Sequence, residues 1–345
     1  MRPVMVLWVA AGGAAEFAAA VPLGLMGRRN RRLGFSSAID LVFAEGFAHL
    51  PEADRAALAD EGFVLHDAEA IFRPHAERFA SLARCGVFLK NCFLRWLVLA
   101  ELFRGEEVLH LDGDVVFNVC PRELGRLCAG RTLLLQGCPA LTAISDPGWF
   151  RIYEAELTAY ARDPAAYSAQ AWRERTGWER TFHTKWAGHW TGPTVASDQD
   201  LLSHLVHTGR LPQADPVEFA RSAPGQVFFE NPLVIGDLVA ERPLAYRRVD
   251  GIDYLGARRI ALWHMQTDWC RYLAKQMLRE KIGPLAGTGR LSFGRRDRET
   301  ILGGVVRKLT RNRLFSRPAI YRRFFEDGDF SAVFTAPRWW QTGVF

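Results

Sequence analysis

Residues 108–117 read V-L-H-L-D-G-D-V-V-F, an apolar run interrupted by two aspartates one residue apart. Val, Leu and Phe are typical of a buried β-strand, whereas carboxylates are rarely buried without a partner. Alternate residues of a strand point to the same side, so we expect Asp112 and Asp114 to share one side of its carboxyl end. Two carboxylates there suit Mg²⁺ or Mn²⁺, which bridges phosphate oxygens. The alternative is that D-G-D only shapes a turn or caps a helix.

The flanking residues predict the fold class. Residues 87–103 place apolar side chains at helical spacing without an internal Gly or Pro, and Gly105 supplies the stop. Polar, alanine-rich segments that fit helices separate the earlier apolar runs. This alternation predicts an α/β domain with a mostly parallel central sheet and helices on both faces. The remaining expected elements are strands at 4–9, 39–43, 62–66, 132–136, 228–235 and 259–264 and a helix at 198–208.

The segment from about 150 to 195 is rich in Trp, Tyr, His and Arg and contains repeated Gly and Pro. We expect loops around a site there. Within it, residues 185–194 read K-W-A-G-H-W-T-G-P-T. Trp faces stack on the apolar faces of sugar rings, so Trp186, His189 and Trp190 are the candidate acceptor site. A packed aromatic loop without a ligand is the alternative.

Composition bounds the class of protein. The chain has 345 residues, of which 49% are hydrophobic and 24% charged, so it has a sizeable core. A formal net charge of +6 favours anionic partners. The six cysteines form no CxxC pair, and we expect reduced thiols in a cytoplasmic protein.

The N-terminal residues 4–26 are apolar over a length that fits a membrane span or a signal peptide. Gly12, Gly13, Glu16 and Pro22 interrupt the run, and the arginines follow it rather than precede it. We therefore expect a short buried strand followed by a glycine-rich loop.

Residues 93–117, F-L-R-W-L-V-L-A-E-L-F-R-G-E-E-V-L-H-L-D-G-D-V-V-F, resemble the core of GT-A-fold glycosyltransferases, most closely the metal-dependent family 8 type. The resemblance implies a Rossmann-like fold and a nucleoside-diphosphate sugar donor, with a UDP-sugar as the expected one. By position, Asp112 would contact the donor ribose or the metal and Asp114 would ligate the metal. Arg95, Lys90 and Gly113 would lie against the donor.

Two further segments resemble the same family. S197-D-Q-D would place Asp198 and Asp200 near the reacting sugar, although plain helix capping explains it equally well. L262-W-H-M-Q resembles the late strand whose histidine, here His264, completes the metal site. The chain then departs from the family pattern: T267-D-W-C-R-Y lacks the diphosphate-binding lysine, for which Arg271 or Lys275 could substitute.

The first strand and its loop, V6-L-W-V-A-A-G-G-A, fit the place where GT-A folds hold the nucleoside through backbone contacts. Ala10 and Gly12 are the candidate donor-binding residues, because glycine lets a ligand approach the backbone closely. The motifs of dinucleotide folds and P-loops do not occur.

The expected organisation is a catalytic domain over residues 1–280 and a basic extension over 281–345. The basic extension could contact an anionic membrane or a lipid-linked acceptor, and solvated arginines are the alternative. A carbohydrate, a lipid-linked sugar or a protein is the expected acceptor. No nucleic-acid-binding module is recognisable.

Two other functions fit part of the sequence. L-D-G-D-V-V also resembles the haloacid dehalogenase-type phosphohydrolase motif, in which Asp112 would be the nucleophile and Asp114 the general acid. That family carries its motif on the first strand, whereas at least three expected strands precede it here. A non-catalytic protein that binds nucleotide-sugars is the second alternative, against which the intact set of Asp112, Asp114 and His264 argues.

Overall fold

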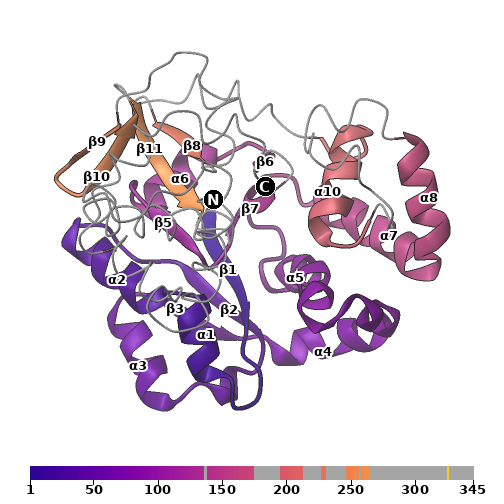
Figure 1. Cartoon of the computed structure of the whole chain (residues 1–345), viewed down its shortest axis with the longest axis horizontal. Helices are drawn as coiled ribbons and strands as arrows, with labels where there is room; N and C mark the ends of the chain where they lie inside the picture. The colour runs from indigo at the N-terminus through magenta and orange to yellow at the C-terminus, as the bar shows by residue number, and fades with distance from the viewer. Residues whose placement is uncertain are drawn as a thin grey trace, which may run out of the picture. The chain divides into compact units, whose positions relative to one another are not determined.

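The computed structural model describes residues 1–135, 138–174, 195–212, 227–230, 246–255, 258–264 and 325 (Figure 1). The chain divides into two compact units that exchange segments along the sequence. Unit 1 contains Met1–Phe17, Phe35–Gly113 and Cys120–Pro224, and unit 2 contains Ala18–Gly34, Asp114–Val119 and Gly225–Phe345.

Unit 1 is built on a six-stranded sheet in the order β3-β2-β1-β4-β7-β6. The pairs β1–β2, β2–β3 and β1–β4 are parallel, whereas β4–β7 and β6–β7 are antiparallel. The four parallel strands are the expected apolar runs. β1, β2 and β4 are largely buried because helices cover them, whereas β3 at the edge of the sheet is partly exposed. The strands are β1 (Arg2–Trp8), β2 (Asp40–Glu45), β3 (Val64–Asp67), β4 (Val108–Leu111), β6 (Leu133–Leu135) and β7 (Cys138–Ile144).

The two faces of this sheet carry different helices. Val4, Val42 and Val108 pack into the main core cluster together with residues of α4 and α5. On the opposite face, Phe43 packs against Phe17 and Phe47. Figure 1 shows α3 on the other side of the parallel strands from α4 and α5. The helices are α1 (Ala14–Ala20), which crosses the boundary between the units, η1 (Phe47–His49), α3 (Glu52–Asp60), α4 (Glu69–Arg78), η2 (Ala80–Cys85), α5 (Val87–Leu102), α6 (Pro121–Cys128), α7 (Gly148–Arg162), α8 (Pro164–Glu174) and α10 (Asp198–His207).

Unit 2 contains a five-stranded sheet, in which β11 is the common partner. β5 and β10 pair with it in antiparallel fashion and β8 pairs with it in parallel fashion, while β9 pairs with β10. Its elements are α2 (Leu23–Arg32), β5 (Val115–Phe117), β8 (Val227–Glu230), β9 (Tyr246–Val249), β10 (Ile252–Leu255) and β11 (Arg258–His264).

The mixed α/β class and the mostly parallel larger sheet confirm the expectation from the sequence. The strands expected near residues 4, 39, 62, 108, 132, 228 and 259 and the helices expected at 87–103 and 198–208 are all present. The mainly antiparallel second sheet is not anticipated by the sequence pattern.

The expectation of loops between 150 and 195 is wrong for its first half, where α7 and α8 lie. Trp149, Tyr153, Leu157 and Tyr160 follow helical spacing and are buried on one side of α7. Aromatic side chains in this segment therefore form core rather than line a loop.

The N-terminal apolar run forms β1, α1 and the start of α2, in agreement with the preferred interpretation. Among the residues that the structure describes, no helix is both long and apolar enough to cross a bilayer. Cys85, Cys92, Cys120 and Cys128 are free thiols, as expected.

Candidate metal and donor site

The two aspartates occupy the turn that leads from β4 into β5. β4 is buried along its whole length, and the Asp112 backbone N–H extends its pairing with β7 by donating to the Ala140 carbonyl at 3.0 Å. β5 begins at Val115, directly after Asp114. Both aspartates are half-buried, so the turn keeps their carboxylates at the surface while the flanking strands are in the core.

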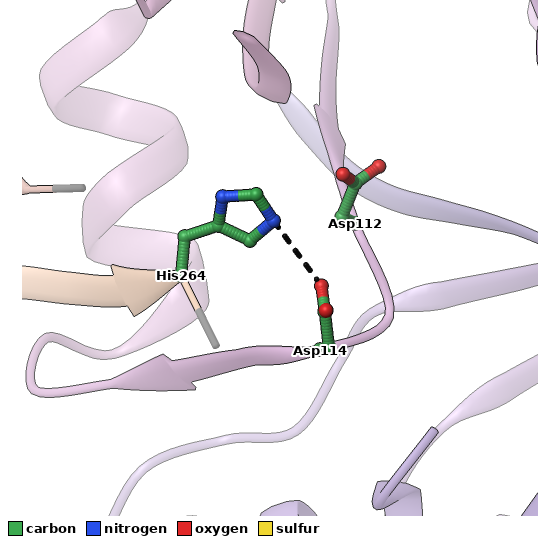
Figure 2. Close-up of side chains that lie close together, drawn as sticks. All are labelled: Asp112, Asp114 and His264. Carbon is green, nitrogen blue, oxygen red and sulfur yellow. Dashed lines mark ion pairs between the residues drawn. The ribbon is translucent and has the colours of Figure 1, made fainter. Parts of the chain in front are cut away.

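His264 is the last residue of β11, and strand pairing places it beside this turn. The register pairs His264 with Val115, Trp263 with Val116 and Leu262 with Phe117. The imidazole Nε2 of His264 lies 3.3 Å from Oδ1 of Asp114, as Figure 2 shows. The side chain of His264 is buried, with a relative exposure of 3%. A histidine that is 150 residues distant in sequence from Asp114 is thus its neighbour in space.

The donor set fits a divalent cation. Asp112, Asp114 and His264 each offer one ligand atom within 4.8 Å of the other two. Two adjacent ligands of an octahedral cation, each about 2.1 Å from it, lie about 3 Å apart, which is close to the spacing of Asp114 and His264. Two carboxylates with one imidazole suit Mn²⁺ better than Mg²⁺, which prefers oxygen ligands.

A buried arginine joins the turn to α10. Arg95 projects from α5 and donates from Nη1 to Oδ1 of Asp112 at 2.8 Å. Its Nε and Nη2 donate to Oδ2 of Asp198 at 3.0 and 2.7 Å. The indole N–H of Trp96 donates to the same oxygen at 3.1 Å. Arg95 and Asp198 are both buried, so each compensates the charge of the other.

Burial and charge shift the pKa values of this cluster. Burial alone would lower the pKa of Arg95, but Asp198 and Asp112 raise it above its ordinary value. Burial raises the pKa of Asp198, and the donors from Arg95 and Trp96 oppose that rise. Burial, assisted by the charge of Arg95, lowers the pKa of His110 to about 3, so His110 is neutral at physiological pH.

Asp200 has a different environment from Asp198. Its Oδ2 accepts hydrogen bonds from the backbone N–H groups of Ala196 and Ser197, each at 3.0 Å, and from the Ser197 hydroxyl at 2.9 Å. Ser197 in turn accepts from the Asp200 backbone N–H, which completes a capping box at the start of α10. The D-Q-D segment therefore has one carboxylate directed to Arg95 and one that begins the helix.

The burial of Asp200 predicts that stability depends on pH. Burial raises the pKa of Asp200 to about 6, above its value of about 3.9 in an unfolded chain. The folded state therefore binds more protons between pH about 4 and about 6, and stability falls as the pH rises through that window. We expect Asp200→Asn to reduce this slope and to keep an acceptor for the cap. Asp200→Ala should cost about 1 kcal/mol in thermal unfolding at pH 7. A slope as steep in Asp200→Asn as in the wild type would contradict this assignment.

Comparison with known proteins shows a likeness to a solved structure. No protein-family model and no curated protein matches the sequence. The solved structure of mouse xyloside xylosyltransferase 1 in its apo form is similar to this chain with a TM-score of 0.41 and 11% sequence identity. The alignment covers 77% of this chain and 98% of that one. A similarity of this size does not by itself establish an activity.

The glycine-rich loop after β1 contains the candidate donor-binding residues Ala10 and Gly12. Gly12 has a φ of +68°, and a Cβ added there would meet no atom within 4 Å. The Gly13 N–H donates to the Ala10 carbonyl at 2.9 Å, which closes a tight turn. Lys90 lies with its ammonium 5.5 Å from the ring centroid of Phe72 on α4, whereas Arg95 contacts Asp112.

Several predicted site residues lie outside the described residues. These are Trp186, His189 and Trp190 of the candidate acceptor site and the possible diphosphate-binding residues Arg271 and Lys275. The basic segment 281–345 is also outside them, apart from Phe325.

The pairing of Arg95 with Asp198 and the role of Trp96 were not predicted. The sequence carries no direct signal for them, since Trp96 follows the apolar pattern of α5.

Proposed function

We propose that the chain is a metal-dependent glycosyltransferase that moves a sugar from a nucleoside-diphosphate donor, with a UDP-sugar as the expected one, to an acceptor hydroxyl. The observation that carries the proposal is the convergence of Asp112, Asp114 and His264 at the carboxyl end of β4, next to the buried Arg95–Asp198 pair. The carboxyl ends of strands are where open α/β sheets bind nucleotides. A cation held by these ligands at that edge of the sheet could bind the phosphate oxygens of the donor diphosphate.

In this proposal Asp112, Asp114 and His264 hold the cation, whose charge would offset that of the diphosphate leaving group. Arg95 fixes the rotamer of Asp112, because its Nη1 bonds one carboxylate oxygen and leaves a second for ligation. Electrostatic stabilisation by these fixed charges is then the main catalytic contribution.

Asp198 is the proposed carboxylate nearest the reacting sugar. Arg95 and Trp96 donate three hydrogen bonds to its Oδ2, so this oxygen would have to give up donors to take a proton from the acceptor. This favours stabilisation of an oxocarbenium-like transition state by Asp198 over proton removal from the acceptor. Asp200, which caps α10, is the less suited of the two predicted catalytic residues.

The acceptor side of the proposal rests on the sequence. Trp186, His189 and Trp190 would stack on and hydrogen-bond a carbohydrate acceptor. The basic segment 281–345 would extend the catalytic domain of residues 1–280 and hold a lipid-linked acceptor or touch an anionic membrane. A protein acceptor would use the same aromatic segment.

The direct test is a panel of nucleotide-sugars incubated with Mn²⁺, scored for release of the free nucleotide and for binding by thermal shift. We expect one donor class, led by UDP-sugars, to raise the melting temperature and to be hydrolysed slowly without an acceptor. Phosphatase turnover, with no shift from any nucleoside diphosphate, would overturn the proposal in favour of a phosphohydrolase. Binding without turnover in the presence of acceptor extracts would favour a non-catalytic binding protein.

A further inference from the structure

A buried carboxylate links the β9–β10 hairpin to β11. Asp253 on β10 is fully buried, with a relative exposure of 0%. It accepts hydrogen bonds from Nε and Nη2 of Arg248 at 2.6 and 3.0 Å and from the indole N–H of Trp263 at 2.8 Å. The negative charge of Asp253 is thus compensated by Arg248 from the neighbouring strand β9. The bond from the indole holds Trp263, which directly precedes His264, in place.

A second set of bonds ties β5 to the same hairpin. Arg29 of α2 is buried and donates to Oδ1 of Asn118 and to the carbonyl of Gly251, each at 2.7 Å, and also to the carbonyl of Phe117. The Asn118 N–H donates to the Ala261 carbonyl of β11 at 3.0 Å. Oδ1 of Asn118 also accepts from the Asp253 N–H at 3.4 Å. These bonds connect β5, which begins directly after Asp114, to β11, which ends at His264.

The position of Trp263 determines which way His264 faces. Successive side chains of a strand point to opposite faces, so an anchored Trp263 directs His264 to the other face. A slip of one residue in the pairing of β11 with β5 would exchange the two side chains. The bonds from Asp253 and Asn118 oppose such a slip, because a shifted β11 would leave buried polar groups without partners.

We infer that Asp253 and Trp263 are positioning residues of the metal site, which set the affinity for a divalent cation by holding His264 beside Asp114. The inference rests on the cation site of the proposed function, but it does not require the chain to transfer a sugar. Asp253, Arg248 and Trp263 do not belong to the proposed ligand set of Asp112, Asp114 and His264. Their effect is to fix the strand end from which the imidazole projects.

The test is the affinity of the full chain for Mn²⁺, measured from the EPR signal of the free ion at a temperature where the protein is folded. Trp263→Phe removes the indole donor and keeps an aromatic ring. We expect it to weaken Mn²⁺ binding about tenfold, which is typical when a residue that orients a metal ligand is replaced. Asp253→Asn keeps an acceptor for the indole and loses the negative charge that faces Arg248. This second variant serves as the test if Trp263→Phe does not fold.

The matched control is Tyr167→Phe, which removes a hydroxyl that donates to Glu156 at 2.6 Å between α8 and α7. It should lower the melting temperature and leave both the Mn²⁺ affinity and the Mn²⁺-induced rise in melting temperature unchanged. For Trp263→Phe we expect that rise to shrink. Folded Trp263→Phe or Asp253→Asn protein that binds Mn²⁺ as the wild type does would overturn the inference. A wild-type chain that binds no Mn²⁺ would instead remove the proposed metal site.

Discussion

Asp114→Asn is expected to abolish the rise in melting temperature that Mn²⁺ and a nucleoside diphosphate produce together. The carboxylate of Asp114 lies 3.3 Å from the imidazole of His264, and an amide in its place supplies a neutral and weaker ligand. At a ligand concentration about a hundredfold above Kd the wild type should gain about 2.7 kcal/mol, a shift of a few degrees. Donor turnover should fall by about a thousandfold or more, as on removal of other fixed transition-state contacts.

A suitable control for Asp114→Asn is Asp67→Asn. Asp67 also ends a parallel strand, β3, and its carboxylate accepts a hydrogen bond from the Glu69 N–H at 3.2 Å, which an asparagine oxygen can accept. This variant should keep the full ligand-induced shift. If Asp114→Asn retained the Mn²⁺-dependent shift in differential scanning fluorimetry, Asp114 would not be a metal ligand.

The second large effect is expected at Arg95. Arg95→Met leaves the carboxylate of Asp198 buried without its main partner, and breaking a buried ion pair in this way costs about 3–5 kcal/mol. Urea denaturation followed by circular dichroism would measure the loss. Adding Asp198→Asn to Arg95→Met removes the unpaired charge, so the double variant should recover a large part of the stability while remaining inactive.

An exposed arginine provides the comparison for Arg95. Arg78 forms an ion pair with Glu154 in which both side chains are largely exposed, and Arg78→Met should cost less than about 1 kcal/mol. Similar losses from Arg78→Met and Arg95→Met would show that the buried pair has no special importance. A double variant no more stable than Arg95→Met would show that the loss does not come from the stranded carboxylate.

The elements around the aspartates were predictable because each has a strong local pattern. The apolar run 108–111 and the helical spacing of 87–102 leave little choice of structure, and both flank the D-G-D turn. The aromatic residues of 149–160 were misread as loop, since aromatic side chains bind sugars and also fill cores, and composition alone does not separate the two.

Long-range pairings account for what the sequence did not predict. β5 has only three residues, and its partner β11 lies more than 140 residues further along the chain. Local propensity does not specify such a pairing. The ion pair of Arg95 with Asp198 likewise depends on how α10 packs against the core, which no spacing in the sequence encodes.

The turn of Asp112 has a consequence for charge balance. The carboxylates of Asp112, Asp114 and Asp198 and the guanidinium of Arg95 together carry three negative charges and one positive charge when ionised. A cation of charge two would bring this group to formal neutrality, whereas Na⁺ or K⁺ would leave one negative charge uncompensated. If the cluster binds a cation as proposed, this charge balance would favour a divalent ion over the abundant monovalent cations, in addition to any preference from ligand geometry.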